Sequence, residues 1–240
     1  MSTGLTAVLL AGGRGTRLKP YTLVLPKPLM PIGELPVLEV MLQQLGRVGV
    51  TRVVLCVGYL REILFAYLEP RRASYPFTLE YVTEHEPMGT VGPVTQVEGL
   101  TDTFLLGNGD VLTTLDYADL VRFHKARGAA MTVATAPRDV KIDYGVLEVD
   151  ANQRITGQIE KPTYHYDVSM GVYVVEPRAL ALVPRGMAYD VPELIRELIR
   201  RGEPVLSYKS DCYWLDIGRH DDYAVAVQDF ERMHDQFLPR

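Results

Sequence analysis

A glycine turn directly after a short apolar segment places the tightest constraint on how this chain can fold. Residues 5–10 are apolar and suit a buried β-strand, and the glycine-rich residues 12–15 follow at once. Glycine lets backbone N–H groups converge on an anion without a Cβ in the way, and Arg17 and Lys27 close behind can neutralise phosphate oxygens. The stretch 8–38 therefore predicts a phosphate-binding turn at the end of a strand.

Two other glycine motifs do not fit this turn. A dinucleotide-binding G-x-G-x-x-G would need a third glycine where Leu18 stands. A Walker A loop would need a lysine followed by Ser or Thr at a fixed distance, and no lysine here meets that condition. For Gly13 and Gly15 alone, an ordinary strand-to-loop connection with surface arginines remains the alternative.

The first eighty residues alternate between predicted strands and helices. Between 35 and 48 the apolar residues Leu38, Leu42 and Leu45 recur on one helix face. The predicted segments in this part are strand 5–10, helix 35–48, strand 52–57, helix 60–68 and strand 77–82. Such a parallel α/β pattern gathers ligands beyond the carboxyl ends of its strands, which is where the glycine turn lies.

The rest of the chain predicts a sheet that becomes mixed. Strands follow one another without helices between them in the middle of the chain, which requires antiparallel neighbours. Asp190, with Glu193 three residues on, has the pattern of a helix N-cap and needs no catalytic role. The predicted segments here are strand 103–106, helix 116–127, strand 131–135, a hairpin of strands 144–149 and 155–159 around a polar turn at 150–153, helix 190–200, strand 205–208 and helix 220–234.

Composition and charge exclude several classes of protein. The 240 residues, 47% apolar and 23% charged, predict a single globular domain spanning 1–240. A net charge of −5 argues against nucleic acid as a partner, and no apolar run reaches the 18 residues of a membrane span. The two cysteines, Cys56 and Cys212, fit no metal or redox spacing, and no signal-peptide pattern opens the chain, so a reducing cytoplasm is expected.

For several segments that contain glycines or acidic residues, the local pattern alone allows either a structural role or a ligand-binding role. Gly89 and Gly92 flank Thr90 and suit either a backbone that approaches a flat ligand or a plain loop. Asp110, after a short strand and two glycines, is either a turn residue or a metal ligand. Asp216 stands among bulky apolar residues, where a carboxylate is costly to bury unless it is paired or bound to a cation.

Two later segments also allow a purely structural interpretation of their local pattern. Gly145 could mark a β-bulge. Glu160 and Lys161 could belong to an edge strand that enters solvent.

Taken together, GGRGTRL at 12–18 and PKP at 26–28 resemble the N-terminal motif of the sugar-1-phosphate nucleotidyltransferases, also called nucleotide-sugar pyrophosphorylases. This resemblance covers residues 5–229. It implies the nucleotide-diphospho-sugar transferase fold, an α/β fold of the Rossmann-like three-layer α/β/α type with a central mixed, mainly parallel sheet. Residues 1–115 would then bind the nucleotide and residues 116–240 the sugar phosphate.

The resemblance also implies roles for particular residues. GNGD at 107–110 and WLDIG at 214–218 are similar to the family's two Mg²⁺-binding motifs, which makes Asp110 and Asp216 the expected metal ligands. The expected catalytic residues are Arg17, Lys27, Asp110 and Asp216. The expected nucleotide-binding residues are Leu10, Ala11, Gly12, Gly13, Arg14, Gly15, Thr16, Arg17, Lys27, Gly89 and Asp110.

On the sugar side, the motifs YG and EKP make Gly145, Glu160 and Lys161 the expected sugar-phosphate contacts, and the hairpin half of the chain the expected sugar-facing side. Ser169 is added to them, although many relatives have asparagine at this position, so the sugar cannot be carried over. A homodimer is left open.

The base is suggested by the segment EHEPMGTVGP at 84–93. It is similar to the E-x-x-L-G-T-[AG]-G pattern of guanylyltransferases that act on mannose- or heptose-type sugar phosphates, although Val91 and Pro93 depart from it. Thymidylyl and uridylyl members tend to have a glutamine-bearing segment there. GTP is therefore the expected nucleotide, and thymidylyl, uridylyl or cytidylyl transfer is retained as the alternative.

Two further alternatives belong to other classes. A glycosyltransferase of similar fold would hold its metal with a D-x-D pair, whereas Asp110 is followed by Val111 and Leu112. A non-catalytic regulatory subunit would be expected to lack some of Arg17, Lys27, Asp110, Lys161 and Asp216, and all five are present.

Overall fold

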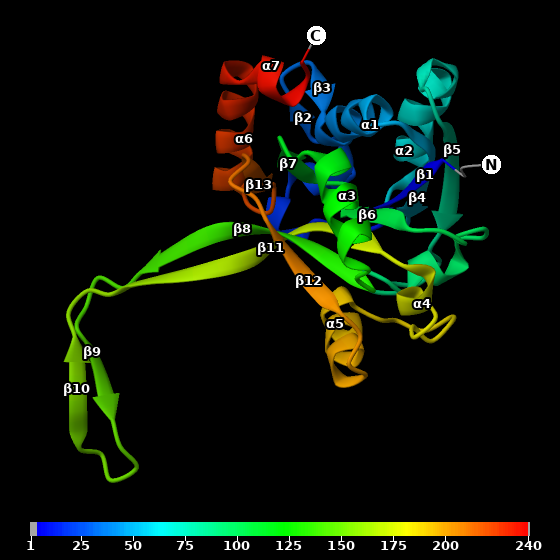
Figure 1. Cartoon of the computed structure of the whole chain (residues 1–240). Coiled ribbons are helices and arrows are strands. Elements are labelled where there is room, and N and C mark those ends of the chain that lie inside the picture. Colours follow the sequence, from blue (N-terminus) through cyan, green and yellow to red (C-terminus); the bar gives the residue numbers. More distant parts are fainter. Residues whose placement is uncertain (1–3, 240) are drawn as a thin grey trace.

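The computed structural model describes residues 4–239, and its centre is a seven-stranded mixed sheet with the order β12-β8-β11-β6-β1-β4-β5 (Figure 1). Strand β11 runs antiparallel to both β6 and β8, and the other neighbours are parallel. The sheet strands are β1 (Leu5–Ala11), β4 (Val50–Val57), β5 (Thr78–Thr83), β6 (Phe104–Asn108), β8 (Met131–Lys141), β11 (Thr163–Val175) and β12 (Val205–Lys209).

Helices cover both faces of this sheet and bury its alternating side chains. In β1, Ala7 and Leu9 pack toward α1, α2 and α3, whereas Val8 packs toward α4 and α5 on the other face. These helices are α1 (Val37–Arg47), α2 (Arg61–Leu68), α3 (Tyr117–Arg127), α4 (Pro177–Leu180) and α5 (Val191–Arg200). The three layers confirm the predicted α/β/α fold.

A third apolar cluster lies beside the glycine turn and joins the C-terminal helices to the N-terminal loop. Phe230 of α6 (His220–Arg232) and Phe237 of α7 (His234–Phe237) pack there with Leu18 and Ile32. The end of the chain is therefore fastened to the segment that carries Arg17 and Lys27.

Short elements complete the chain. The small strands are β2 (Pro31–Ile32), β3 (Leu35–Pro36), β7 (Val111–Thr113) and β13 (Trp214–Asp216). The 3-10 helices are η1 (Thr16–Leu18), η2 (Tyr21–Leu23), η3 (Lys27–Leu29), η4 (Glu69–Ser74) and η5 (Pro93–Gln96).

Two predicted helices have different bounds in the structure. The helix predicted at 35–48 starts only at Val37, because Leu35 and Pro36 pair with β2. The helix predicted at 220–234 is interrupted at Met233, which separates α6 from α7.

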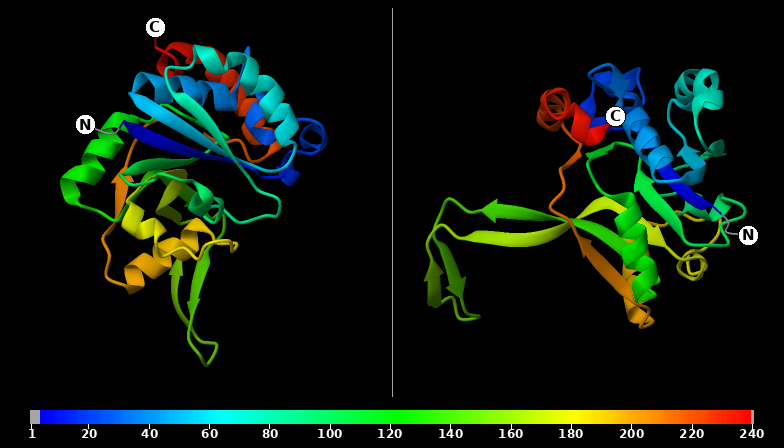
Figure 2. Two further views of the ribbon diagram at one scale, coloured as in Figure 1. Left: turned by 90° about the vertical axis from the view of Figure 1, so that its right-hand side faces the viewer. Right: turned by 45° about the horizontal axis from the view of Figure 1, so that its top comes forward.

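The predicted hairpin exists but lies outside the central sheet. Strands β9 (Val146–Val149) and β10 (Ile155–Ile159) pair with each other in a separate two-stranded sheet. The outer parts of β8 and β11 form a long ribbon that carries this hairpin away from the body, as both Figure 1 and Figure 2 show. The residues 137–166 are called the arm below.

Within residues 4–239, no helix is long and apolar enough to cross a lipid bilayer.

Candidate active site

The glycine turn closes tightly around the carboxyl ends of β1 and β4. A Cβ on Gly12 would collide with Oε1 of Glu84, and Gly15 has a left-handed φ of +58°. The carbonyl of Gly15 accepts hydrogen bonds from the Thr22 hydroxyl at 2.8 Å and from Leu18 N–H at 2.9 Å. Gly13, by contrast, has nothing within 4 Å of its Cβ position, so the turn is open on the side where an anion could approach.

Two short strands bring Asp110 and Asp216 together although they lie far apart in sequence. Asp110 directly precedes β7, and β13 pairs antiparallel with β7 so that Asp216 is the partner of Val111. The Lys27 ammonium lies between the two carboxylates, with its Nζ 2.5 Å from Asp110 Oδ2 and 3.3 Å from Asp216 Oδ1. These three predicted residues thus form one cluster.

The cluster has the donors that a divalent cation requires. Among residues 4–239 no three His, Cys, Asp or Glu side chains are placed to hold a metal, but Mg²⁺ needs only one or two carboxylates when phosphates and waters supply the rest. Oδ1 of Asp110 is buried without a hydrogen-bond partner in the described chain. Asp110 and Asp216 therefore fit a Mg²⁺ ion.

Burial dominates the ionisation of Asp110. It raises the pKa of this carboxyl above the ordinary aspartate value, and the adjacent Lys27 ammonium opposes the rise. A further cation close to the carboxylate would oppose it in the same way.

Arg17 reaches the same cluster from the glycine turn. A Cβ on Gly218 would lie 3.3 Å from both terminal nitrogens of Arg17 and 3.1 Å from Asp216 Oδ2. The guanidinium and the carboxylate therefore share the space above Gly218, and a side chain at Gly218 would displace them. Arg17 joins Lys27, Asp110 and Asp216 around one point.

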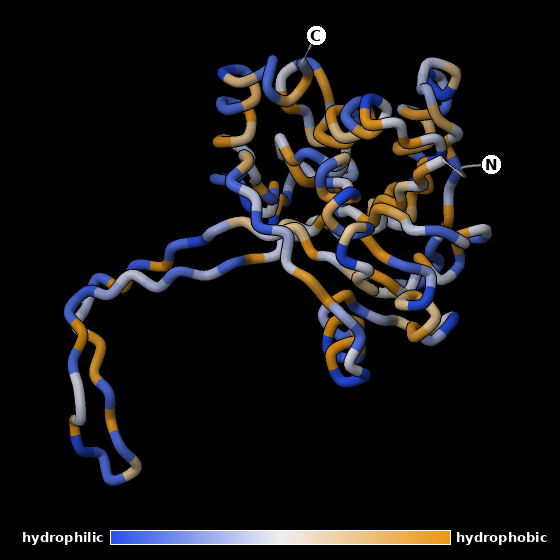
Figure 3. Tube along the Cα trace, in the orientation of Figure 1, coloured by the Kyte–Doolittle hydropathy of each residue, from blue (hydrophilic) through white to orange (hydrophobic). Residues whose placement is uncertain are grey.

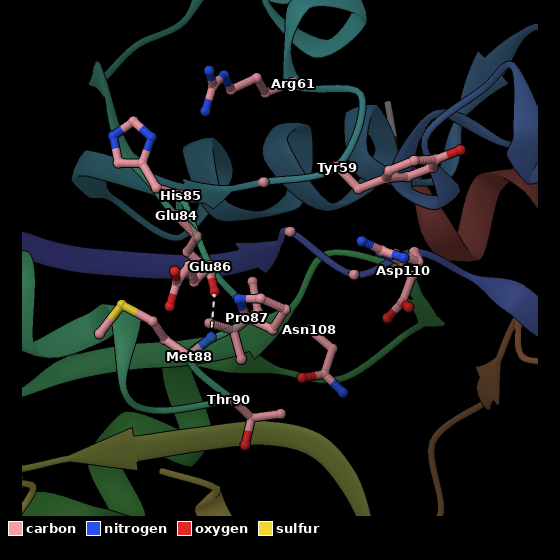
Figure 4. Close-up of a pocket in the computed structure, with 16 residues that line it drawn as sticks. Tyr59, Arg61, Glu84, His85, Glu86, Pro87, Met88, Thr90, Asn108 and Asp110 are labelled. Carbon is pink, nitrogen blue, oxygen red and sulfur yellow. Dashed lines mark hydrogen bonds between the residues drawn. The ribbon is translucent and has the colours of Figure 1, made fainter. Parts of the chain in front are cut away.

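A cleft of about 650 Å³ opens beside this cluster, which is a volume typical of small-molecule sites (Figure 4). It is lined by Leu10, Gly12, Gly13, Arg14, Gly58, Tyr59, Arg61, Glu84, His85, Glu86, Pro87, Met88, Gly89, Thr90, Asn108 and Asp110. Of the predicted nucleotide-binding residues, Leu10, Gly12, Gly13, Arg14, Gly89 and Asp110 line the cleft directly. Ala11, Gly15, Thr16, Arg17 and Lys27 belong to the adjoining turn and charge cluster.

Glu84 is a site residue for which the motif analysis assigned no role. Its carboxylate lies next to Gly12 and accepts a hydrogen bond from the Met88 backbone N–H at 3.2 Å (Figure 4). Burial raises the pKa of Glu84, and the Met88 N–H opposes the rise. In the sequence, the available signal was an acidic residue two positions after the end of the predicted strand 77–82.

The wall of the cleft at 88–92 is held from behind by α5. The Asp190 carboxylate accepts from Thr90 N–H at 2.8 Å and from the Thr90 hydroxyl at 3.0 Å, while that hydroxyl accepts from Val191 N–H. Gly89 has a φ of +73°, and a Cβ there would press on the Tyr189 carbonyl at 2.7 Å. Asp190 therefore does more than the helix-capping role expected of it, because it also fixes the segment that faces the ligand.

Asn108 and Ser169 lie at the junction of the cleft and the arm. Gly171, at a φ of +73°, packs so closely on Asn108 that a Cβ would lie 2.6 Å from its Nδ2. The Ser169 hydroxyl donates to Tyr173 Oη at 3.1 Å and accepts from Gly171 N–H at 3.3 Å. Of the four residues predicted to contact the sugar phosphate, Ser169 alone lies at the base of the arm, beside the body.

The other three are carried away from the cluster. Gly145 immediately precedes β9, and Glu160 and Lys161 immediately follow β10, so all three lie at the hinge between the hairpin and the ribbon. Gly145 and Glu160 do face each other, since a Cβ on Gly145 would be 2.9 Å from Glu160 Oε2. Within a single chain, however, the structure does not bring them to Lys27 and Asp110.

Comparison with known proteins adds the following. Residues 6–233 match the family described as nucleotidyl transferase. Relatives include a mannose-1-phosphate guanyltransferase of Debaryomyces hansenii, 32% identical over 225 residues, which cover 90% of this chain and 62% of that protein. A UTP–glucose-1-phosphate uridylyltransferase of Synechocystis sp. is 30% identical, with 92% of this chain and 62% of that protein covered. The chain thus spans less than two thirds of the length of these curated relatives.

Among solved structures, HddC from Yersinia pseudotuberculosis superposes with a TM-score of 0.72 at 24% identity and covers 94% of this chain and 99% of its own. A structure of the same protein complexed with GMP-PN gives the same TM-score at 23% identity. A putative glucose-1-phosphate thymidylyltransferase from Bacillus anthracis reaches 0.74 at 20% identity and covers 93% of this chain and 94% of that chain. These likenesses confirm the nucleotide-diphospho-sugar transferase fold.

Proposed function

Because this chain belongs to the nucleotidyl transferase family, we propose that it transfers a nucleotidyl group from a nucleoside triphosphate to a sugar 1-phosphate. An oxygen of the sugar phosphate attacks the α-phosphorus, a P–O bond to the β-phosphate breaks, and pyrophosphate leaves with its electron pair. The product is a nucleotide-diphosphate sugar. The observation that carries this proposal is the Lys27 ammonium between Asp110 and Asp216, beside an open glycine turn.

The reaction depends more on neutralising the negative charge of the phosphates than on proton transfer. The attacking phosphate oxygen is already ionised near neutral pH, so no general base is required. The barrier comes from bringing several negative charges together and holding them in line. A site of two cationic side chains and two carboxylates suits that task better than a histidine–serine pair would.

Each residue of the cluster has a distinct part in this proposal. Arg17 would hold the triphosphate and the departing pyrophosphate, and Lys27 would neutralise the region of the α-phosphate. Asp110 and Asp216 would hold Mg²⁺, which supplies charge neutralisation at the phosphate oxygens when it is bound. Lys161 would hold the phosphate of the sugar, with Glu160 accepting hydrogen bonds from sugar hydroxyls.

We propose GTP as the nucleotide, on the strength of Glu84. Guanine carries two adjacent N–H donors on its Watson–Crick edge, and an ionised carboxylate can accept from both. Glu84 points into the cleft next to Gly12, at the end of the cleft away from Asp110 (Figure 4). Several of the relatives are named as guanylyltransferases, including a Mycobacterium tuberculosis protein that is 32% identical over 234 residues. A mannose- or heptose-type sugar 1-phosphate is the proposed acceptor.

The test compares combinations of nucleoside triphosphate and sugar 1-phosphate as substrates. The purified chain is given each of GTP, UTP, CTP and dTTP with a panel of sugar 1-phosphates and Mg²⁺, and pyrophosphate release is measured. We expect the highest kcat/KM with GTP and a mannose- or heptose-type phosphate. A preference for a pyrimidine nucleotide would overturn the base assignment but leave the reaction class standing.

A further inference from the structure

The arm is an unsupported ribbon with a hairpin at its end. From Thr135 opposite Ser169 to Lys141 opposite Thr163, β8 and β11 pair without a break in register, and β9 and β10 continue beyond (Figures 1 and 2). An isolated two-stranded hairpin is at best marginally stable in water. We therefore expect the arm to be stabilised by packing against another surface.

Exposed apolar side chains concentrate on the arm. Of the thirteen large apolar side chains that are exposed within residues 4–239, seven belong to it. Apolar residues recur along both strands of the hairpin (Figure 3). The cross-strand pairs Val149–Ile155 and Val146–Ile159 lie on opposite faces, because Val146 and Val149 are three residues apart on one strand. The seven exposed arm residues are Val140, Tyr144, Leu147, Val149, Ile155, Ile159 and Tyr166.

The body carries a second exposed apolar group, at the rim of the candidate active site. Tyr21, Leu23 and Val24 are 50%, 53% and 74% exposed. They lie on and directly after η2, in the segment between Arg17 and Lys27. We call Tyr21, Leu23 and Val24 the rim patch.

The geometry points to a two-fold dimer in which each arm lies on the partner's body. The hairpin packs on the partner's rim patch, and Glu160 and Lys161 complete the sugar-phosphate side of the partner's site. The role of these two residues rests on the proposed function. A two-fold arrangement is self-complementary, so it covers both arms and both rim patches at once.

The length of the ribbon separates Lys161 from its own active site. Six residue steps from Ser169 to Thr163, at about 3.3 Å each, place Thr163 about 20 Å beyond the edge of the body. Lys161 lies two residues before Thr163 in the sequence, on the side of the hairpin. In this conformation the lysine is out of reach of its own cluster and available to another copy.

The charge of the arm favours another copy of this chain over an acidic lipid surface or a nucleic acid. Residues 137–166 contain four Lys and Arg side chains and five Asp and Glu side chains. Such a balanced arm has no electrostatic attraction to a polyanion. Apolar faces flanked by both signs of charge are instead what a protein interface provides.

The first experiment measures the oligomeric state of the full chain by sedimentation velocity. We expect a dimer for the wild type and a monomer for the double variant Leu147→Asp/Ile155→Asp, which should still unfold in a single cooperative transition because the hairpin lies outside the core. Val24→Asp should dissociate the dimer in the same way. Ile199→Asp is the matched control, because Ile199 on α5 is 62% exposed and lies outside the arm and the rim patch. A monomeric wild type, or a dimer that persists in the hairpin variant, overturns the proposal.

The second experiment leaves the hairpin apolar residues intact. It tests whether Lys161 acts in the active site of its own chain or in that of the partner. Lys161→Ala and Asp110→Asn chains are co-expressed with different tags, and heterodimers are isolated through both tags. If the arms are exchanged, the site on the Lys161→Ala chain keeps its own Asp110 and receives an intact Lys161 from the partner, so it is complete. The site on the Asp110→Asn chain lacks both residues. Each heterodimer should therefore show about half of the wild-type activity. Each homodimer should show strongly reduced activity. Heterodimers no more active than the homodimers would show that the arm acts within its own chain.

The two proposals fail separately. If the wild type forms no nucleotide-diphosphate sugar with any substrate pair, the proposed function is wrong, while sedimentation still decides the dimer. If the wild type is active but the heterodimers are not, the delivery of Lys161 to the partner is wrong and the reaction stands.

Discussion

At the scale of single residues, the site holds charged groups that are partly removed from water and are stabilised by neighbours of opposite charge. Oδ1 of Asp110 is buried without a hydrogen-bond partner, and the Lys27 ammonium, 2.5 Å from Oδ2, offsets the cost of burying this charge. Both residues were predictable from sequence because their neighbours form recognisable motifs. Glu84 was not given a role, because an acidic residue after a strand looks the same whether it faces a ligand or solvent.

Glu84 gives the sharpest prediction about the base. Glu84→Gln replaces a charged acceptor by an amide that offers only one acceptor oxygen, and hydrogen bonds to charged groups are worth about 1.5–3 kcal/mol. The KM for GTP should rise by about 10- to 100-fold, with little change for UTP. Steady-state kinetics with both nucleotides checks this, and Glu98→Gln, an exposed glutamate outside the cleft, serves as the control. A uniform loss with all nucleotides would contradict recognition of guanine by Glu84.

Gly171 tests the close packing behind Asn108. Gly171→Ala places a Cβ at a φ of +73° and 2.6 Å from Asn108 Nδ2, so the loss in unfolding free energy should exceed the roughly 1–2 kcal/mol of left-handed backbone strain. Gly186→Ala has the same φ in open space and should show the strain alone. Urea unfolding of the two variants measures the difference. Equal losses would mean that the Asn108 contact is easily relieved.

At the scale of elements, the sequence predicted most of the main strands and helices but not β11, the longest strand of the central sheet, and it missed how short pieces pair. The caps of α3 and α5 at Asp116 and Asp190 follow local rules and were predictable. The three-residue strands β7 and β13 were not, because their pairing joins segments about one hundred residues apart and no local pattern encodes it. That pairing is what brings Asp216 to Asp110.

A buried histidine links α3 to the sheet and makes stability depend on pH. His124 contacts Thr132 at 2.8 Å and Glu176 at 3.1 Å. Burial lowers the pKa of His124 and outweighs the opposing effect of Glu176. Below about pH 6.5 the unfolded chain takes up a proton that the folded protein resists, so this contribution to stability is present above that pH and is lost as the pH falls.

The prediction is a fall in unfolding free energy of at most about 1.4 kcal/mol per pH unit from this residue as the pH drops below about 6.5. His124→Gln should flatten that slope, and His234→Gln, at a half-exposed position, should leave it unchanged. Urea denaturation at a series of pH values measures all three proteins. A slope that is the same in the wild type and in His124→Gln would contradict the assignment.

At the scale of the whole molecule, the three-layer fold is set by the sequence pattern, but the direction of the arm is not. Strands that alternate in hydrophobicity look alike whether they join the central sheet or leave it, because the pattern does not say what they pack against. This is why Glu160 and Lys161 were expected on the sugar-facing side and are found on an outlying hinge. The dimer proposed above would reconcile the two, because it would bring both residues to the active site of the partner.

The most direct test of the central claim compares the wild type with Asp110→Asn. With GTP, a mannose-type sugar 1-phosphate and Mg²⁺, the wild type should form a guanosine-diphosphate sugar, seen by mass spectrometry, together with an equal amount of pyrophosphate. Asp110→Asn should lower the rate by at least about 100-fold in a protein that still folds, since it removes a carboxylate that would hold Mg²⁺ at the reacting phosphates. Asp235→Asn, at an exposed position, should keep the wild-type rate. Equal rates for the wild type and Asp110→Asn would contradict the account of a reaction centred on Lys27, Asp110 and Asp216.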